Sequence, residues 1–387
     1  MSIPEIIILT LFFALLYIFI LYPILLWIFS KIFKKPLKID INFKPLVTFI
    51  ISAYNEEKYI KAAIESIISS GYPSNLIRII VGSDGSTDNT ATIVKELQNK
   101  YDGISLYEFE RSGKNYVLNQ LVLKADTEII MFMDADLRIN KGILDDCLNK
   151  FSNSSIGCVM CSLNIIQQNN NNNIGTFGEI LYQKLETKIR HYESLINSNV
   201  NSLGTLYGIR KQYFINFPND LVCDDFFTIL SIAKHKKRVF FDQLLEVIEI
   251  REKSLKGEIK RRVRLVAGGL STIWKMKRLL LPDYGWTTFF LISHKLIRYL
   301  SPLFLITFIV IMLLMNQDSF LFKPLVYAQL FLYITATLGY LLEKINIRFF
   351  LFRISVFFIS MNIGFLLGIF RFLKQGQNSK WDRVDAN

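Results

Sequence analysis

The chain has 387 residues, of which 51% are hydrophobic, with a mean hydropathy of +0.31 and a net charge of +12. This apolar share exceeds that of an ordinary soluble domain, and much of it lies in long unbroken runs, which argues against a wholly soluble protein. The length allows two or three domains, and about 200 residues without such a run remain for one soluble domain.

The positive charge is concentrated beside the apolar runs. In a soluble protein this charge would suggest nucleic acid as a partner. Membrane proteins, however, mark their cytoplasmic side in this way, because the lipid head groups there are anionic. We therefore expect membrane lipids and no nucleic acid as partners. The basic residues concerned are Lys31, Lys34, Lys35, Lys38 and Lys44 after the first run, and Lys256, Lys260, Arg261, Arg262, Arg264, Lys275, Lys277 and Arg278 before the later ones.

The first apolar run, residues 6–28, contains no charged residue and is long enough to span a bilayer as a helix. A signal peptide is the alternative, but no Lys or Arg precedes the run and no small-residue cleavage site follows it. We predict a transmembrane helix within residues 1–30, with its lysine-rich end and the following domain in the cytoplasm.

Between residues 42 and 250, short apolar strands alternate with amphipathic helices. The strands are predicted at 47–52, 76–81, 105–109 and 129–133, and the helices at 56–70, 88–100 and 114–124. This alternation predicts an α/β fold with a mostly parallel, doubly wound sheet. Ligands of such sheets bind beyond the carboxyl ends of the strands, and the polar motifs of this chain follow the predicted strands at those ends.

The first two strands and a later helix are each next to a polar motif. Ala53-Tyr54-Asn55-Glu56 follows the first strand, and Asp84-Gly85-Ser86-Thr87-Asp88 follows the second. A tight turn and a helix cap explain most of the second motif, but not Asp84, which precedes the turn and can accept hydrogen bonds from a base or a ribose. Residues 111–115 open the next helix with a glycine and two cations, which suit phosphate oxygens.

Asp134 and Asp136 end the fourth predicted strand. In an extended chain both carboxylates point to the same face, at the rim of a cleft. Hard divalent cations prefer such oxygen ligands, and Mg²⁺ or Mn²⁺ would also neutralise a leaving diphosphate. The alternative is that both are solvated loop acids. The buried strand before them favours the metal site over this alternative.

In this order, the motifs resemble those of family 2 glycosyltransferases with the GT-A (doubly wound, Rossmann-like) fold. The match includes Lys114 with residues 118–119, and it extends to an acceptor-side segment at residues 204–210. Asp224-Asp225 is similar to the family's Glu-Asp motif, although acids at a helix N-terminus are a structural alternative.

The resemblance implies a role for each matched residue. Asp225 would be the general base that takes the proton from an acceptor hydroxyl in one inverting displacement, with Asp224 beside it. Asp136 would bind Mn²⁺ or Mg²⁺, with Asp134 next to the metal, the ribose and the diphosphate. The other implied contacts are donor contacts at Ala53, Tyr54, Glu56, Asp84 and Lys114, and acceptor contacts at Gly204 and Tyr207.

Residues 256–298 mix basic and apolar side chains, which predicts amphipathic helices along the membrane interface. Cellulose, hyaluronan and poly-N-acetylglucosamine synthases carry Q-x-x-R-W on such a helix. Here residues 261–265 read RRVRL, so Arg replaces Gln and Leu replaces Trp. Arg264 would still pair with the donor diphosphate, but the missing Trp puts processive polymer synthesis in doubt.

Three late apolar runs, near 299–315, 325–342 and 354–370, predict transmembrane helices within residues 299–373, followed by a tail at 374–387. An odd number of late spans puts the C-terminus outside. The opposite placement is favoured by Arg371, Lys374, Lys380 and Arg383. The sequence therefore leaves this topology open.

Two smaller features carry structural expectations. Cys158 and Cys161 have the spacing of half a zinc site, but no second pair follows, so we expect buried structural thiols in a reducing compartment. Residues 167–173, QQNNNNN, predict a surface loop.

The resemblance implies a multi-pass protein of the inner or plasma membrane that transfers sugar from a nucleotide-sugar, with UDP favoured, to a saccharide acceptor in exopolysaccharide or cell-surface glycan synthesis. A homo-oligomer would help so few spans to form a polymer channel. Transfer of one sugar to a lipid-linked acceptor is an alternative. A non-catalytic nucleotide-binding subunit of a synthase is another, which the presence of both Asp136 and Asp225 disfavours.

Overall fold

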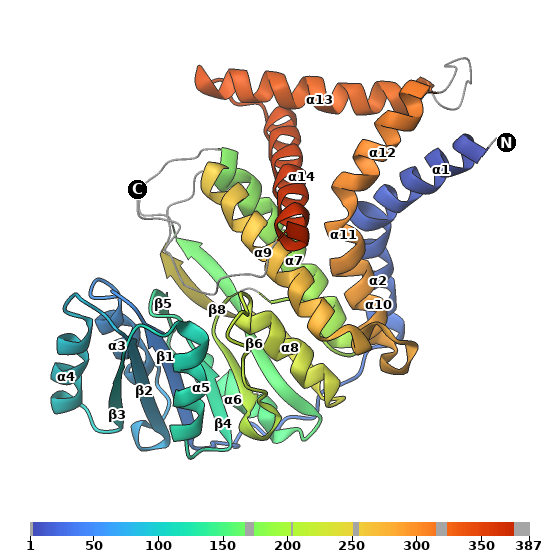
Figure 1. Ribbon diagram of the computed structural model, residues 1–387. Coiled ribbons are helices and arrows are strands. Elements are labelled where there is room, and N and C mark those ends of the chain that lie inside the picture. The colour runs from blue at the N-terminus through green and yellow to red at the C-terminus, as the bar shows by residue number, and fades with distance from the viewer. Residues whose placement is uncertain (1–2, 167–173, 203, 251–254, 315–322, 375–387) are drawn as a thin grey trace.

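The computed structural model describes residues 3–166, 174–202, 204–250, 255–314 and 323–374. An α/β domain lies below a layer of long helices, which includes both the first and the last described helix (Figure 1). This arrangement confirms the predicted α/β fold with additional apolar helices. The predicted loop at 167–173 and most of the C-terminal tail, residues 375–387, lie outside the described residues.

The domain is built on an eight-stranded sheet in the order β3-β2-β1-β4-β7-β6-β8-β5. β1 pairs in parallel with β2 and β4, and β2 pairs in parallel with β3. β6 also pairs in parallel with β8, whereas β7 is antiparallel to both of its neighbours and β5 is antiparallel to β8. The sheet is therefore mostly parallel, as predicted. The strands are β1 (Val47–Ala53), β2 (Ile77–Asp84), β3 (Ile104–Phe109), β4 (Ile129–Phe132), β5 (Leu137–Arg138), β6 (Ile156–Ile166), β7 (Tyr207–Arg210) and β8 (Arg238–Ile250).

Helices cover both faces of this sheet. Side chains of a strand alternate between the two faces, and in β1 Phe49 and Ile51 pack with α3 (Ile60–Ile68), α4 (Thr90–Lys100) and α6 (Ile143–Asn149). Ile50 faces the other way and packs with α5 (Lys114–Lys124) and α8 (Asp224–Lys234). All seven residues of β1 are buried, as expected for a parallel strand covered on both sides.

The carboxyl ends of the central strands lie at one edge of the sheet. In the register, Ala53 of β1 is opposite Ser83 of β2, and Ile50 is opposite Phe132 of β4. The residues that follow these strands are therefore neighbours. On the same side of the domain, the long helix α7 (Ile174–Ile196) reaches into the helix layer (Figure 1).

Three described helices are long and apolar enough to cross a membrane: Glu5–Ile32, α13 (Lys323–Lys344) and α14 (Phe350–Lys374). The segments Trp286–Tyr299 and Ser301–Leu313 make a fourth candidate, with a bend of 54° between them. The first candidate consists of α1 (Ile3–Leu16), a π-helical turn η1 (Tyr17–Leu21) and α2 (Tyr22–Ile32). The bent candidate contains α10 (Trp286–Phe290), the π-helical segment η7 (Leu291–Leu296), α11 (Ile297–Tyr299) and α12 (Ser301–Leu314).

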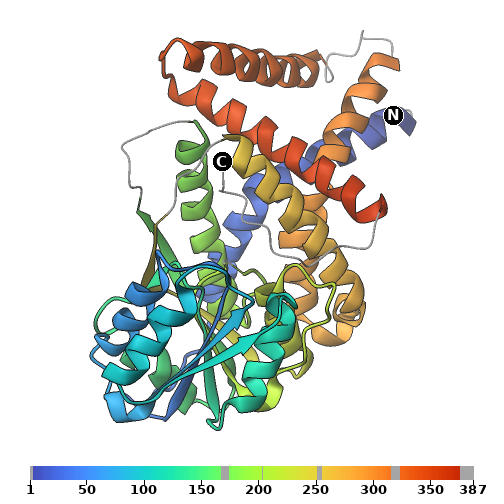
Figure 2. The ribbon, with the colours of Figure 1, turned by 60° about the vertical axis from the view of Figure 1, so that its left-hand side comes forward.

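α12 leads away from the domain and α14 returns toward it, and α13 lies across the far ends of both (Figures 1 and 2). The contacts of α14 agree with this arrangement. Gly339 of α13 packs on Phe352 in the first third of α14, while Gly364 near its other end packs on Arg262. The C-terminal end of α14 is therefore on the domain side.

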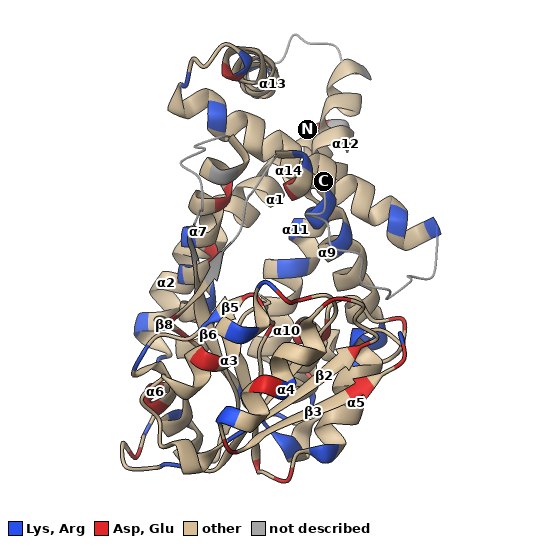
Figure 3. Ribbon diagram, turned by 90° about the vertical axis from the view of Figure 1, so that its left-hand side faces the viewer, with Lys and Arg blue, Asp and Glu red and all other residues tan. Residues whose placement is uncertain are grey.

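α9 (Leu255–Lys275) is the amphipathic helix predicted at the membrane interface. Arg262 and Val266 are buried against α14, and Trp274 is 67% exposed. α9 is thus partly enclosed by protein between α14 and the domain. Its basic residues and those of α11 lie between the domain and the far helices (Figure 3).

The four cysteines of the chain are buried and free. Cys158 and Cys161 lie on the buried strand β6. The prediction of buried structural thiols is confirmed.

Candidate active site

The loops after β1 and β2 are joined by hydrogen bonds. The Asn55 amide donates to Ser86 Oγ at 3.2 Å, and the Thr87 amide donates to Asn55 Oδ1 at 2.8 Å. Asp88 Oδ1 accepts the amide of Thr90, the first residue of α4, at 3.0 Å, while Asn89 occupies the N-cap position without a side-chain cap. The two loops form one rigid rim beside the strand ends.

Asp84 holds the next loop in place. It is 1% exposed and accepts the backbone amides of Ser112 at 2.7 Å and Gly113 at 3.0 Å, as well as the Arg111 guanidinium. The guanidinium lies 3.5 Å from the centroid of the Tyr54 ring. Tyr54 and Asp84 are therefore connected through Arg111, a residue that the motif comparison did not include among the site residues.

Lys114 connects two of the candidate acids. Its Nζ lies 2.9 Å from Asp134 Oδ1 and 3.2 Å from Asp224 Oδ2. Burial alone would lower the pKa of Lys114, but the charges of both carboxylates raise it above its ordinary value. Burial raises the pKa of Asp224, which Lys114 opposes and the charge of Asp225 reinforces. Lys114 therefore remains charged and offsets the repulsion between these acids.

The extended geometry predicted for residues 134–136 is wrong. β4 ends at Phe132, and the amide of Leu137 donates to the carbonyl of Asp134 at 3.2 Å, which closes a turn. Asp134 lines the cavity described below, whereas Asp136 does not. The turn forms because β5 begins at Leu137 and pairs antiparallel with β8, so the chain reverses within a few residues.

Asp225 is fixed at the start of α8. Its Oδ2 accepts the amide of Gly204 at 2.7 Å, and its Oδ1 accepts the amide of Phe226 at 2.7 Å. Gly204 has a φ of +65°, which favours glycine. Among the described residues, no lysine or arginine lies within salt-bridge distance of Asp225, in contrast to Asp224.

Two amide side chains of α5 hold the segment that leads into α8. Asn119 Nδ2 donates to the carbonyl of Phe217 at 2.9 Å, and Asn119 Oδ1 accepts the Phe217 amide at 2.8 Å. Asn115 donates to the carbonyl of Leu221 at 2.7 Å. The residues around Lys114 thus position both Lys114 itself and the chain before Asp224.

A cavity of about 590 Å³ lies between the domain and the helix layer. The helix side of its wall comes from α7, α9, the segment 294–299 and α14, and it includes Arg264, whose buried Nε has no hydrogen-bond partner in the described chain. The domain side includes Lys114, Asp134, Gly204, Tyr207, Asp224 and Asp225. The cavity therefore brings the candidate catalytic acids next to the basic helices.

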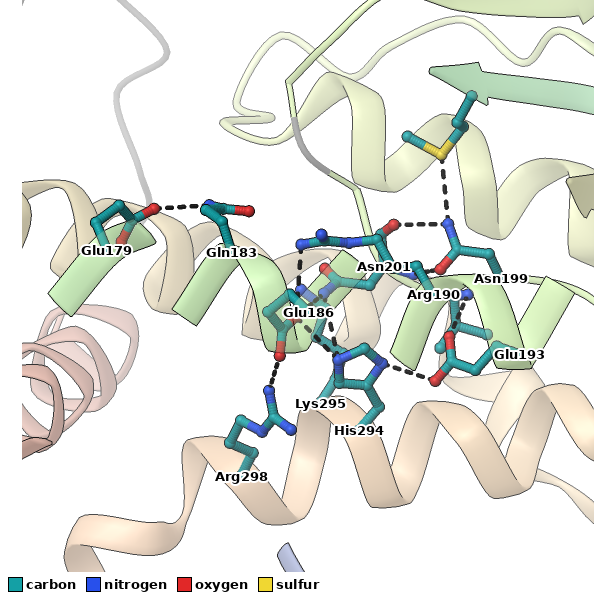
Figure 4. A network of polar contacts seen from close by, with 12 residues as sticks. Glu179, Gln183, Glu186, Arg190, Glu193, Asn199, Asn201, His294, Lys295 and Arg298 are labelled. Carbon is teal, nitrogen blue, oxygen red and sulfur yellow. Dashed lines mark hydrogen bonds and ion pairs between the residues drawn. The ribbon is translucent and has the colours of Figure 1, made fainter. Parts of the chain in front are cut away.

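On the helix side of the cavity, a buried polar network joins the domain to the helix layer (Figure 4). Glu186 of α7 is 0% exposed and pairs with Arg298, with His294 Nε2 at 3.0 Å and with Arg190 at 3.4 Å. The other ring nitrogen of His294 lies 2.7 Å from Glu193 Oε1. Both ring nitrogens of His294 therefore face carboxylates of α7.

The structure separates the predicted site residues into two groups. One group lines the cavity and consists of Lys114, Asp134, Gly204, Tyr207, Asp224, Asp225 and Arg264. The other lies along the adjacent strand ends, outside this lining, and consists of Ala53, Tyr54, Glu56, Asp84 and Asp136. Sequence reasoning missed Glu186, Arg190 and Lys295 as lining residues. The available signal was the cost of charges such as His294, Lys295 and Arg298 within an apolar segment.

Comparisons with known proteins concern the family and fold of the α/β domain. Residues 48–211 match the family model described as Glycosyl transferase family 2. The poly-beta-1,6-N-acetyl-D-glucosamine synthase of Staphylococcus aureus (strain COL) is 26% identical over 243 residues, which cover 61% of this chain and 57% of that protein. The enzyme of the same name from Staphylococcus epidermidis is 24% identical over 229 residues, or 58% of this chain and 54% of that protein. The matched region thus spans little more than half the length of these relatives.

One solved structure supports the fold over nearly the whole chain. It is the mannosyltransferase PcManGT from Pyrobaculum calidifontis in complex with GDP-Man and Mn²⁺. The TM-score is 0.72 at 21% sequence identity, and the match covers 96% of this chain and 99% of that chain. The α/β domain is therefore of the GT-A type, and the helix layer resembles that of PcManGT.

Proposed function

Because the domain at residues 48–211 belongs to glycosyltransferase family 2, a family of EC 2.4 enzymes, we propose that this chain is an active, inverting, membrane-bound glycosyltransferase with its domain in the cytoplasm. It takes sugar from a nucleotide-sugar donor, with UDP-sugars as the first candidates, and transfers it to a saccharide or lipid-linked acceptor. The observation that carries the proposal is the arrangement of Asp134, Lys114 and Asp225 around one cavity.

The donor nucleotide is proposed to lie along the strand ends, with its diphosphate directed into the cavity. Tyr54 and the loop held by Asp84 are placed to line the nucleotide pocket. Because the Asp84 carboxylate already accepts two backbone amides and the Arg111 guanidinium, its main contribution is to position this loop. Lys114 and Arg264 supply positive charge for the diphosphate.

The acids of the 134–136 turn suit a divalent cation. Asp134 is 41% exposed, and its second oxygen remains available beside the one that contacts Lys114. In the described chain no group of three or more His, Cys, Asp or Glu side chains is placed to hold a metal ion. Asp134 and Asp136 therefore fit Mn²⁺ or Mg²⁺ only in combination with donor phosphate oxygens. When bound, the cation would neutralise charge on the departing diphosphate.

Asp225 is the better candidate for the general base. Both acids line the cavity, but Asp224 is bound to Lys114, whereas Asp225 has no lysine or arginine within salt-bridge distance among the described residues and is oriented by two backbone amides. The acceptor hydroxyl oxygen forms a bond to the anomeric carbon, while the bond from that carbon to the diphosphate breaks and Asp225 receives the proton. Attack from the side opposite the leaving group inverts the anomeric configuration.

The test is release of nucleotide by the full-length protein in lipid nanodiscs. A panel of UDP- and GDP-sugars is supplied with Mn²⁺, with Mg²⁺ or with EDTA, in the presence of membrane lipid extract as an acceptor source. We expect metal-dependent release from one donor and loss of release in the Asp225→Asn variant. Binding of nucleotide without release from any donor would favour the non-catalytic subunit instead.

A further inference from the structure

We propose that the helix side of the cavity is a phosphate-binding subsite for a lipid-linked acceptor. This inference rests on the function proposed above and adds the chemical class of the acceptor. The acceptor is an amphiphile in which a phosphate group connects a lipid chain to the saccharide whose hydroxyl reacts at Asp225.

The first observation is a set of buried guanidinium nitrogens without a partner. Arg190 is 2% exposed, and its Nε and Nη1 make no hydrogen bond within the described chain. Arg298 is 4% exposed, and its Nε also has no partner there. Arg264 Nε is unpaired as well, but Arg264 is assigned above to the donor diphosphate, so the subsite depends on Arg190 and Arg298. Buried donors of this kind are costly unless an acceptor meets them. All three residues line the cavity, where ligand oxygens can reach them.

Lys295 is a fourth cation of this wall. Its Nζ lies 3.5 Å from the Tyr299 hydroxyl and 4.9 Å from the centroid of the Phe226 ring. Within the described residues, no carboxylate lies within salt-bridge distance of it. Since Phe226 directly follows Asp225, Lys295 places a positive charge beside the proposed base.

The charge balance on this side of the cavity favours an anion. Glu186 is the single carboxylate among the described lining residues of α7, α9, the segment 294–299 and α14. It is already bound to Arg298, His294 and Arg190. It cannot also neutralise Lys295, so a phosphate group would compensate charge that the protein leaves unpaired.

The same wall is partly apolar. Phe365 and Leu367 of α14 and Leu265 of α9 line the cavity together with the cations, and Leu367 is 47% exposed. A free phosphate ion gains nothing from such residues, whereas an acyl or isoprenoid chain does. Because α14 is a candidate membrane span, a lipid could enter along it with its phosphate directed toward the cations.

The phosphate is an anchor and not the attacking group. A phosphate oxygen is already ionised at neutral pH and needs no base, whereas a saccharide hydroxyl does. Asp225 is held in place by two amides on the same cavity wall as Phe226. One acceptor could therefore contact both residues, with its saccharide hydroxyl at Asp225 and its phosphate at Lys295.

The experiment measures binding of farnesyl phosphate, a short lipid phosphate, to the full-length protein in zwitterionic nanodiscs by calorimetry, with empty nanodiscs as the blank. Farnesol and inorganic phosphate are the comparison ligands. The variants are Lys295→Met, Lys295→Arg and Lys275→Met, where Lys275 pairs with Asp220 outside the cavity. Removal of Lys295 leaves no buried carboxylate unpaired, so Lys295→Met is expected to keep its thermal stability.

We expect farnesyl phosphate to bind the wild type. The Lys295→Met variant should bind it at least tenfold more weakly, because one charge-assisted hydrogen bond is lost. Lys295→Arg and Lys275→Met should retain binding. The proposal is overturned if Lys295→Met binds like the wild type, if farnesol binds equally well, or if inorganic phosphate alone binds as tightly. Nucleotide release is measured on the same preparation. Binding without release contradicts the proposed enzyme, whereas release without binding contradicts only this subsite.

Discussion

Replacement of Glu186 by Gln is expected to destabilise the interface between the domain and the helix layer. The loss in unfolding free energy should exceed that of a substitution at an exposed residue. The Glu186 carboxylate is fully buried and faces the guanidinium groups of Arg298 and Arg190 and the ring of His294. Gln can still accept one hydrogen bond, but it leaves the two guanidinium groups without a counter-charge in a buried place. Loss of one partner from a buried ion pair typically costs about 3–5 kcal/mol, and we expect a loss in that range.

The assay is equilibrium unfolding of the full-length protein in lipid bicelles, with the same lipid composition for every variant. Glu96→Gln on the exposed surface of α4 is the matched control and should change the free energy of unfolding by less than about 0.5 kcal/mol. The double variant Glu186→Gln with Arg298→Met should recover part of the loss, because one uncompensated cation is removed. A loss in Glu186→Gln no larger than that of the control would refute the assigned role of this carboxylate.

Four further predictions follow from the site and the helix layer. Although burial alone would raise the pKa of Glu186, the Arg298 and Arg190 guanidinium groups and His294 hold it well below its ordinary value of 4.5. Its contribution to stability is therefore complete above that pH and is lost as the pH falls through the lowered pKa. Unfolding free energies measured from about pH 5 downward should decline more steeply in the wild type than in Glu186→Gln, and equal slopes would contradict this role. Asp225→Asn should lower turnover by at least about 100-fold with little change in donor affinity, measured by steady-state kinetics and nucleotide titration; unchanged turnover would remove Asp225 from its role. Asp136→Ala should weaken the Mn²⁺ requirement, read as a higher Mn²⁺ concentration for half-maximal nucleotide release, and an identical metal titration would exclude Asp136 as a ligand. Single cysteines at Lys323 and Lys344 should both react with a membrane-impermeant maleimide from the side opposite the domain, whereas labelling of one position from each side would show that α13 crosses the bilayer.

The sequence predicted the strands and the strand-end motifs well because both depend on local patterns. Apolar runs of four to eight residues define buried parallel strands, and polar residues directly after them necessarily lie at one edge of the sheet. α5 was predicted with the same bounds that the structure shows, Lys114–Lys124. Glycine before the helix and two asparagines within it indicate this segment, although their hydrogen bonds to residues 217–221 depend on the fold.

The geometry of Asp134 and Asp136 was not predictable from the strand pattern. Whether the chain continues or turns after Phe132 depends on the pairing of β5 with β8, which comes from more than a hundred residues later. The polar network also depends on contacts between residues that are far apart in the sequence. Glu186 and Arg298 are 112 positions apart, so no local pattern relates them. Only the cost of buried charges in an apolar segment indicated that Arg298 needs a partner.

We propose that the conflict over the C-terminus arises because each apolar run was counted as one crossing, although α13 is a candidate span by length and composition. Composition alone does not distinguish a helix that crosses a membrane from one that lies across the ends of its neighbours, and α13 has this second arrangement (Figure 2). With α12 leading away from the domain and α14 returning to it, Arg371 and Lys374 come back to the domain side, where the excess of basic residues predicts the cytoplasm. Arg371 also lines the cavity. Under the proposed subsite, the same charges would both orient the helices in the membrane and attract the phosphate of an incoming lipid.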